Sequence, residues 1–454
     1  MRDVFFLVFL AGFFALGFKR GFLLVLAYAY IDIVSPQRLS YYLLNSIPIS
    51  AIAFGLAVLG WLIADDKAET RLSWRQMLML LLLGWCGYTT WHADYPMEAL
   101  TKWDWAWKAL IFAIFLPLTL RTRLRMEALA LVMVLCASSI IITGGIKTLL
   151  SGGGYGVLNL MVNDNSGLYE GSTISTVAIA IIPLILWLTQ HGTIFPPDRR
   201  VKLFGWALCG ACLLIPIGTE TRTGLLCIVL LGGLMLMHMK RRVLYGGLIA
   251  LAAIAAIPFL PQSFTARMDT IENYQADESA STRVAVWKWT IDYVKDNPWG
   301  GGFDAYLGNS FRYEARQMNG PPGAQVVERH IVVDKGRAYH SAYFEMLGEQ
   351  GIPGFLLWAL IHGLSLARTE WIRRAYRKRT GPRHAWISPL ALALQQGHLI
   401  YLLGALFVGI AYQPFVWMLI ALQISLSTYV ARQRRHESAV PIFARRMPLA
   451  GATA

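Results

Sequence analysis

The stretch Arg337-Ala-Tyr-His-Ser-Ala-Tyr-Phe-Glu345 closes the longest polar segment of this chain. That segment covers residues 261–341 and contains no apolar run long enough to cross a membrane. The motif Gly348-Glu-Gln-Gly-Ile-Pro-Gly354 and another apolar helix follow directly. A membrane enzyme carries out its chemistry where water, lipid head groups and protein meet, and this junction is such a place.

Composition and hydropathy place the rest of the chain among polytopic membrane proteins. Of its 454 residues, 56% are hydrophobic and only 15% are charged. Apolar runs recur along the whole chain, and in lipid a helix satisfies its own backbone polar groups. We therefore predict an all-α polytopic membrane protein with about twelve transmembrane helices. The candidate spans are residues 4–18, 22–34, 47–64, 76–91, 105–120, 127–144, 173–189, 202–218, 224–239, 243–260, 350–368, 389–412 and 415–431.

The N-terminal segments leave the number of spans open. Residues 4–18 and 22–34 are each shorter than the roughly 20 residues that a span needs. They form either two tilted short helices or one interrupted element. The count is therefore twelve or thirteen, and the side of the membrane on which Met1 lies is not fixed.

The net charge of +14 comes mainly from short basic clusters between the apolar segments. These clusters alternate with loops that are poor in Lys and Arg, which is the pattern that keeps positive loops on the cytoplasmic side. Topology therefore explains the charge, and nucleic-acid binding is not indicated. The clusters lie at residues 19–20, 67–75, 121–125, 199–202, 240–242, 368–383 and 432–446.

With the basic clusters inside, the chain divides into four parts. These are an N-terminal transmembrane bundle, an outside loop, C-terminal transmembrane helices and a cytoplasmic tail, at residues 1–260, 261–341, 342–431 and 432–454. The outside loops are then residues 35–46, 92–104, 145–172, 219–223 and 261–349, with a last turn at 412–414. No internal repeat is evident, so an inverted-repeat transporter is not supported.

The long outside segment has its own local structure. Residues 281–295 have the pattern of an amphipathic helix, which Asn297-Pro-Trp-Gly-Gly-Gly302 ends. Trp287 and its aromatic neighbours suit the bilayer interface. We predict that the next stretch, residues 309–334, is a less regular flap.

Three outside residues stand out as candidates for chemistry. Arg222 lies in a short loop between two apolar spans, against the positive-inside trend, although it could also reach lipid phosphates or pair with Glu220. Arg283 lies near the start of the amphipathic helix, where an anion is favoured, although it could be a solvated arginine. His340 is able to accept a proton at ambient pH, although it could be a capping or packing histidine.

The outside loops lack the residues that several classes of enzyme need. The outside loops carry no paired carboxylates or histidine clusters of the kind that a metal-dependent transferase uses. They also lack a glycine-rich phosphate loop followed by Lys, and a serine elbow. A phosphate-bearing substrate would therefore be held by arginines, whose planar guanidinium suits it.

The order of these motifs resembles the O-antigen ligase (WaaL-type) family. The motifs are Thr221-Arg-Thr-Gly224, then Ser281-Thr-Arg283 followed by Trp287 and Asn297-Pro-Trp-Gly-Gly-Gly302, and finally His340-Ser-Ala-Tyr-Phe-Glu-Met-Leu-Gly-Glu-Gln-Gly-Ile-Pro-Gly354. The wider group includes O-antigen polymerases and bacterial protein O-oligosaccharyltransferases. The stretch from residue 140 to 175 is similar to the exosortase-associated O-glycosylation ligase branch.

The resemblance implies a GT-C-type glycosyltransferase fold with a large periplasmic loop, in the bacterial inner membrane. It implies transfer of a glycan from undecaprenyl diphosphate to a lipid A–core acceptor, by an inverting reaction that uses neither metal nor cofactor. Carried over by motif, His340 is the catalytic base, and Arg222 and Arg283 hold the diphosphate.

Three further residues are predicted to bind substrate, namely Lys147, Arg337 and Tyr339. The alternative for each of the two cations is an ordinary solvated loop residue. A polymerase and a protein O-oligosaccharyltransferase are alternative enzymes with the same motifs. A lipid-linked sugar transporter is the alternative outside the enzymes.

Overall fold

The structure is a computed structural model, and it describes residues 2–40, 42–44, 46–68, 70–151, 168–237, 239–256, 258, 278–319 and 326–439. The first half is helical. Its helices are α1 (Arg2–Lys19), α2 (Phe22–Val34), α3 (Pro36–Leu39), α4 (Ile49–Ala64), α5 (Trp74–Trp91), α6 (Pro96–Thr119), α7 (Arg123–Ser151), α8 (Gly171–His191), α9 (Arg199–Gly218), α10 (Arg222–Leu236) and α11 (Arg242–Ala256).

The second half adds the elements that surround the junction at His340. In order they are α13 (Glu278–Asp296), the short 3-10 helix η2 (Ala305–Gly308), strands β1 (Ser310–Asn319) and β2 (Val326–Lys335), and helices α14 (Ala342–Tyr376), α15 (Ile387–Ala405) and α16 (Pro414–Ala439). The first part of the predicted outside loop and the end of the predicted tail lie outside the described residues.

Each predicted apolar segment coincides with one helix. The two N-terminal segments form separate helices, α1 and α2, rather than one interrupted element. In the described part of the chain, five helices are long and apolar enough to cross a membrane: α7, α8, α9, α14 and α16. Helices α2, α4 and α10 are apolar but shorter. The protein is therefore a mostly helical membrane protein.

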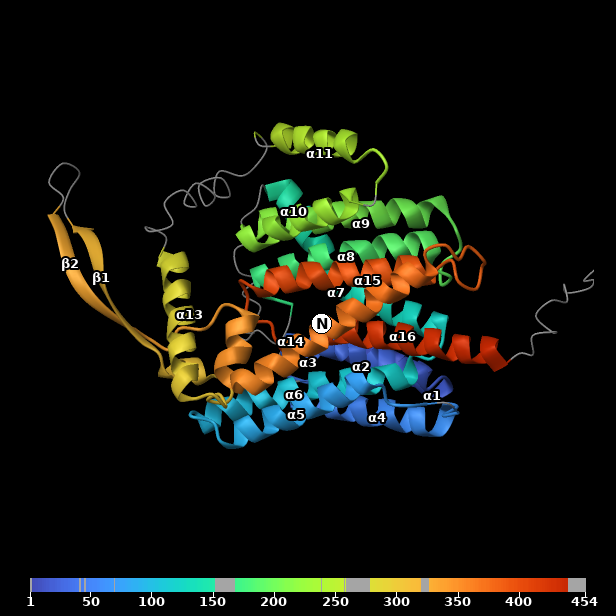
Figure 1. The fold of residues 1–454 in the computed structure, drawn as a ribbon, viewed down its shortest axis with the longest axis horizontal. Helices are drawn as coiled ribbons and strands as arrows, with labels where there is room; N and C mark the ends of the chain where they lie inside the picture. The colour runs from blue at the N-terminus through green and yellow to red at the C-terminus, as the bar shows by residue number, and fades with distance from the viewer. Residues whose placement is uncertain are drawn as a thin grey trace, which may run out of the picture.

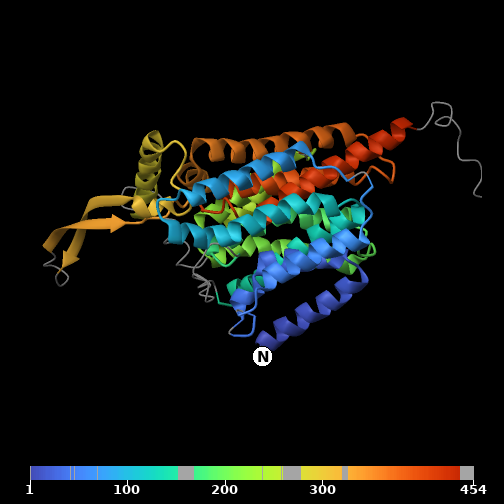
Figure 2. The same cartoon turned by 90° about the horizontal axis from the view of Figure 1, so that it is seen from below.

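Most of the helices lie side by side in one bundle, with α11 apart from it, and α13 stands at one end of the bundle with strands β1 and β2 projecting beyond (Figure 1). Seen from below, α13 and the two strands again lie at one end of the bundle, and α1 lies along one edge (Figure 2). Strands β1 and β2 pair antiparallel, with Ser310 opposite Lys335. The all-α prediction thus holds for the bundle, whereas residues 310–319 and 326–335 form two regular antiparallel strands and not the irregular flap that we predicted for residues 309–334.

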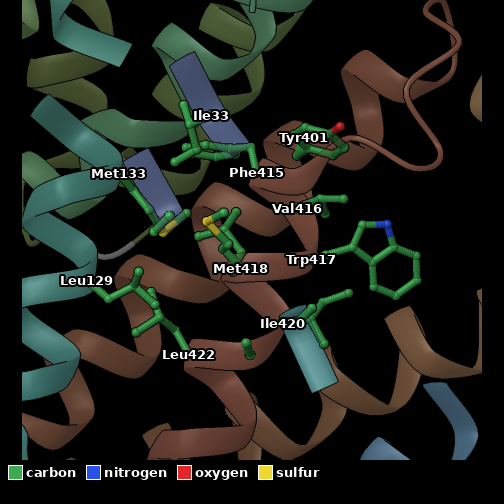
Figure 3. Packing of buried hydrophobic residues seen from close by; sticks show 14 of the residues in the cluster. Ile33, Leu129, Met133, Tyr401, Phe415, Val416, Trp417, Met418, Ile420 and Leu422 are labelled. Atoms are coloured by element: carbon green, nitrogen blue, oxygen red, sulfur yellow. The ribbon is translucent and has the colours of Figure 1, made fainter. Parts of the chain in front are cut away.

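Helix α16 forms the centre of the bundle. Its residues from Phe415 to Leu422 are buried on every side, which is expected of a helix enclosed by other helices. Figure 3 shows this packing, with Met418 and Leu422 beside Leu129 and Met133 of α7. The core therefore connects the N-terminal and C-terminal halves of the chain.

The predicted basic clusters meet at the other end of the bundle from α13. Arg125 of α7 donates to Asp65 after α4 at 2.6 Å, and the Arg123 guanidinium lies 5.1 Å from the ring of Trp386 before α15. Arg432 of α16 donates to the carbonyl of Arg121. Segments far apart in sequence thus place their positive charge on one face, as the positive-inside pattern predicts.

Helix α14 is broken at Gly351, and the motif Asn297-Pro-Trp-Gly-Gly-Gly302 packs against the break. Gly351 has φ +62°, and a Cβ there would lie 2.3 Å from the carbonyl oxygen of Pro298. Gly301 donates its N–H to the carbonyl of Gly348 at 3.1 Å, and Gly302 donates to that of Glu349 at 2.9 Å.

These bonds satisfy carbonyls that the break leaves without helical partners. The third such carbonyl, that of Gln350, accepts from the Trp85 indole of α5 at 2.8 Å. The N–H of Ile352, after the break, donates to Pro298 at 2.9 Å. The two motifs that the sequence separates by some fifty residues are therefore one structural unit, which fixes the first turns of α14 beneath His340.

Candidate active site

The backbone before His340 is held on both sides. Asn309 accepts the N–H of Arg337 at 2.9 Å and donates to its carbonyl at 2.7 Å. Trp287 of α13 donates its indole N–H to the carbonyl of Tyr339 at 2.8 Å, and its ring stacks on Phe344 with centroids 4.9 Å apart. These contacts fix the position of His340 relative to α13 and α14.

His340 itself has φ +48°, a left-handed conformation that is rare for a residue other than glycine. Among the described residues, Glu220 and Asp304 share this feature, at +54° and +58°, as does Ser35. Such backbone costs about 1–3 kcal/mol for each residue and clusters at functional sites. Three of the four flank the candidate site, which supports a functional reason for the strain.

His340 lines a cavity of about 330 Å³ at the α13 end of the bundle. One wall is Tyr339 and Tyr306, and another is the first turns of α6. Solvent reaches the imidazole through the open side. The polar residues of the lining are Thr101, Lys102, Asp304, Tyr306, His340 and Glu345.

Lys102 of α6 is the centre of an ion network in this cavity. Its Nζ lies 2.6 Å from Glu345 and 2.6 Å from Glu349, both of α14, and 3.6 Å from Asp304. Glu349 is fully buried, and it also accepts the backbone N–H of Asp304 at 3.1 Å. A buried carboxylate needs such partners, so Lys102 stabilises the arrangement of all three acids.

The network also ties the cavity to the loop before α16. The second oxygen of Glu345 accepts the N–H of Ala411 at 3.1 Å. Burial raises the pKa of Asp304, which Lys102 opposes. Lys102 and these acids therefore form one paired network in this wall of the cavity.

The His340 imidazole is biased toward its neutral form. Desolvation by the surrounding protein lowers the pKa of His340 below its ordinary value, and Arg283 lowers it further. Glu170 opposes this, and Arg337 adds to the lowering. A neutral imidazole at ambient pH is the state that accepts a proton.

Arg283 lies on α13 one helical turn before Trp287, so the two share a helix face. Because Trp287 contacts the carbonyl of Tyr339, that face is turned to the His340 segment. The effect of Arg283 on the pKa of His340 agrees with this placement. The structure therefore brings Arg283 and His340 together.

Arg222 occupies the first turn of α10 in a loop built from hydroxyl groups. Thr221 donates to Ser175 of α8 at 2.9 Å, and Thr219 lies 2.7 Å from the same hydroxyl. A Cβ on Gly224 would lie 2.6 Å from Pro216, so glycine allows α10 to pack closely on α9. The Thr-Arg-Thr-Gly motif thus fixes Arg222, which is half-buried, beside the start of α8.

Glu170 lies at the start of α8, beside the loop that carries Arg222. Its carboxylate caps α8 by accepting the N–H groups of Ser172 and Thr173. A Cβ on the adjacent Gly171 would lie 3.4 Å from Thr219, so this helix end touches the loop before Arg222. The same Glu170 raises the pKa of His340, so it lies near enough to act on that imidazole as well.

The three predicted substrate-binding residues occupy different places. Lys147 is exposed on α7 next to Thr148, whose hydroxyl lies against Gly218 at the end of α9. Arg337 forms an ion pair with Asp334 of the hairpin. Tyr339 is buried, and burial raises its pKa well above the ordinary value.

Only some of the predicted residues line the cavity. In the described part of the chain, His340 and Tyr339 belong to the cavity wall, whereas Arg222, Arg283, Lys147 and Arg337 do not. Arg283 and Arg337 are close enough to act on His340, and Arg222 with Lys147 lies at the neighbouring ends of α7, α9 and α10.

Sequence reasoning missed the ion network of Lys102, Asp304, Glu345 and Glu349. Lys102 lies in the predicted outside loop 92–104, so the argument that selected Arg222 applies to it equally. Glu345 ends the stretch that begins at Arg337, and Glu349 lies in the motif Gly348–Gly354, but neither position predicts a contact with Lys102. Their pairing joins residues more than 240 positions apart, and no spacing pattern reveals that.

Family models match two parts of the chain. The model of the O-antigen ligase family matches residues 207–359, which include Arg222, Arg283 and His340. A model described as a family of unknown function, DUF5935, matches residues 1–193, which include Lys102. Among curated proteins, none matches the chain. The exosortase-associated branch stays a prediction, whereas the predicted resemblance is borne out over part of the chain: residues 207–359 form an O-antigen ligase domain.

Proposed function

We propose that this protein transfers a glycan from undecaprenyl diphosphate to a hydroxyl of lipid A–core oligosaccharide, at the periplasmic face of the bacterial inner membrane. The observation that carries the proposal is the placement of His340. It lines an open cavity, in a strained backbone conformation, with its imidazole biased to the neutral form. The O-antigen ligase domain at residues 207–359 supports a glycosyltransferase that uses a lipid-linked donor.

In the proposed mechanism, the acceptor hydroxyl enters the cavity beside His340. The imidazole removes the hydroxyl proton while the oxygen attacks the anomeric carbon, and the bond to the diphosphate oxygen breaks. General base catalysis of this kind contributes about 10²–10⁴-fold. Attack opposite to the leaving group inverts the anomeric configuration.

The leaving diphosphate needs positive charge on the other side of the sugar. Arg283 and Arg222 are the proposed donors, because guanidinium groups bind phosphate oxygens in bidentate fashion and stay charged. Donors fixed in advance stabilise the charge that develops on the bridging oxygen, commonly by about 3 kcal/mol each. The hydroxyl contacts of Thr221 and the indole contact of Trp287 provide this fixation.

The ion network around Lys102 has a separate proposed role. Its carboxylate oxygens at the cavity wall are hydrogen-bond acceptors for sugar hydroxyls, so we propose that the acceptor sugar binds on the Glu345 side. We extend the proposal to a GT-C-type arrangement of about twelve spans, as the apolar segments indicate.

The proposal is tested by transfer in vitro with purified protein, lipid-linked glycan and lipid A–core, in the presence of a chelator. Wild-type protein is expected to form the glycosylated acceptor, and His340→Ala to form none above background. Extension of the donor glycan without lipid A–core would instead identify a polymerase. Transfer to a protein acceptor would identify a protein O-oligosaccharyltransferase.

A further inference from the structure

Asp304 lines the His340 cavity, and the mechanism described above gives its carboxylate no part in the reaction. The residue directly follows Gly300-Gly-Gly302 and Phe303. Its backbone has φ +58°, so the chain bears the cost of a left-handed conformation at a residue other than glycine. The position of its side chain in the cavity gives a reason for this cost.

The chain on both sides of Asp304 is held in place. Phe303 is fully buried, with its ring centroid 4.9 Å from that of Tyr412, and Ala305 is 1% exposed. The N–H of Asp304 itself donates to Glu349 at 3.1 Å. The carboxylate therefore projects from a fixed backbone position, which a side chain needs if it is to bind a ligand with defined geometry.

The ordinary structural roles of an aspartate do not account for this side chain. Asp304 stands at the N-cap position of η2, but its carboxylate makes no capping hydrogen bond. It is also the most distant acid of the Lys102 network, at 3.6 Å, whereas Glu345 and Glu349 each lie 2.6 Å from the ammonium nitrogen. The Asp304 distance is longer than a hydrogen bond, so Lys102 leaves the acceptor capacity of this carboxylate largely unused.

The cavity limits the size of a ligand that could reach Asp304. Its volume of about 330 Å³ lies at the lower end of the range for small-molecule sites, about 300–1,000 Å³. Trp105 and Tyr306 add aromatic surface to the lining, and 21% of the Asp304 side chain is exposed. A site of this size, with a carboxylate, two rings and the proposed base, suits the end of a sugar chain and is too small for a long glycan.

We propose that Asp304 determines which acceptor is used, by accepting hydrogen bonds from hydroxyl groups of the acceptor sugar that neighbour the reacting hydroxyl. This role depends on the proposed glycosyl transfer, because an acceptor sugar must enter the cavity. A carboxylate accepts from two neighbouring hydroxyls at once, and its hydrogen bonds are stronger than those between neutral groups. The acceptor is therefore a neutral sugar with free hydroxyls, and a phosphate or carboxylate at these positions is repelled.

The test is steady-state transfer by the purified full-length protein, with lipid A–core varied at saturating lipid-linked glycan, and the reverse. Asp304→Asn keeps the shape of the side chain but replaces an acceptor oxygen with an N–H donor. We expect its KM for lipid A–core to rise at least about 10-fold, while kcat and the KM for the donor change less than about threefold. The matched control, Asp104→Asn, removes a carboxylate of α6 that is 71% exposed and pairs with Lys108, and it should leave both KM values unchanged.

A second variant, Asp304→Gly, separates acceptor recognition from a structural role. Glycine adopts φ +58° without strain, so this variant should unfold at the same temperature as the wild type or a higher one. Its KM for lipid A–core should nevertheless rise at least as much as that of Asp304→Asn. If Asp304 served only as a counter-ion of Lys102, the glycine variant would instead unfold at a lower temperature and keep the wild-type KM.

The outcomes distinguish the role of Asp304 from the proposed function. Transfer to lipid A–core by the wild-type protein, with an unchanged acceptor KM in both Asp304 variants, overturns the role of Asp304 alone. Equal rises in the donor and acceptor KM also overturn it, because Asp304 would then support the whole cavity. Absence of transfer by the wild-type protein overturns the proposed function and the role of Asp304 together.

Discussion

Trp287 donates its indole N–H to the carbonyl of Tyr339 at 2.8 Å, and this one bond links the helix that carries Arg283 to the residue before His340. The ring of Trp287 also stacks on Phe344 in the first turn of α14. The proposed base and one proposed diphosphate ligand are thus fixed relative to each other by a side chain that need not touch substrate.

Removing only this hydrogen bond should impair transfer while the fold persists. In Trp287→Phe the ring still packs on Phe344, but the Tyr339 carbonyl loses its donor. A hydrogen bond of this kind is worth about 1 kcal/mol, and misplacement of a catalytic group costs up to about 10²-fold in rate. We expect the free energy of unfolding to fall by only about 1 kcal/mol. The kcat, measured by steady-state transfer, is expected to fall 10-fold or more. Trp289→Phe on the same helix is the control, and equal losses in both variants would contradict this role.

The pH dependence of transfer should reveal the influence of Arg283 on His340. Transfer requires neutral imidazole, so it is present above the pKa of His340 and lost as the pH falls through that pKa. Because Arg283 holds this pKa below its ordinary value, Arg283→Gln should move the acid limb of the pH–rate profile upward, toward about 6.5. Lys288→Gln, an exposed residue of the same helix, should leave the limb in place. An unmoved limb in Arg283→Gln means that His340 is not the titrating base.

Loss of the Lys102 ammonium should destabilise the protein strongly. Lys102→Met leaves Glu345 and Glu349 without their cation in a buried site, and breaking a buried ion pair in this way costs about 3–5 kcal/mol. Thermal unfolding in detergent, followed by tryptophan fluorescence, measures the effect. Lys108→Met on the same helix breaks a pair with the exposed Asp104 and should cost no more than about 1 kcal/mol. A Lys102 variant as stable as the Lys108 variant rules out a supporting role for the network.

The break in α14 predicts different costs for two glycines of that helix. Gly351→Ala places a Cβ 2.3 Å from the Pro298 carbonyl at a φ of +62°, so the loop that meets the break must shift. We expect a loss of about 1–3 kcal/mol in unfolding free energy. At Gly363 nothing lies within 4 Å of an added Cβ, and alanine there should be neutral or stabilise by up to about 1 kcal/mol. Equal effects at both sites would mean that the break is not required.

The sequence predicted the bundle well because hydropathy reports directly on burial in lipid. Each apolar segment became a helix, and even the short pair became two helices, α1 and α2. The hairpin was not predicted, because its strands lie outside the hydrophobic layer and carry many charged residues. Their pairing depends on neighbours across the hairpin, which a pattern along one strand does not show.

The candidate site was predicted only in part, because some of its residues come together through contacts that only the folded chain creates. Arg222, Arg283 and His340 stand in short motifs that resemble those of a known family. Lys102 has no such motif, and its role depends on contacts with α14 that only the folded chain creates. The glycines of residues 300–302 were predicted to end a helix, but their hydrogen bonds to the carbonyls of Gly348 and Glu349 were not predicted.

The central claim is that His340 is the base of a glycosyl transfer whose diphosphate lies on Arg222 and Arg283. The most direct measurement is single-turnover transfer with saturating lipid-linked glycan, comparing wild type, His340→Ala, Arg222→Gln and Arg283→Gln. The account predicts that His340→Ala binds donor normally and transfers 10²–10⁴-fold more slowly, while both arginine variants also bind donor more weakly. Transfer by His340→Ala at the wild-type rate would contradict it.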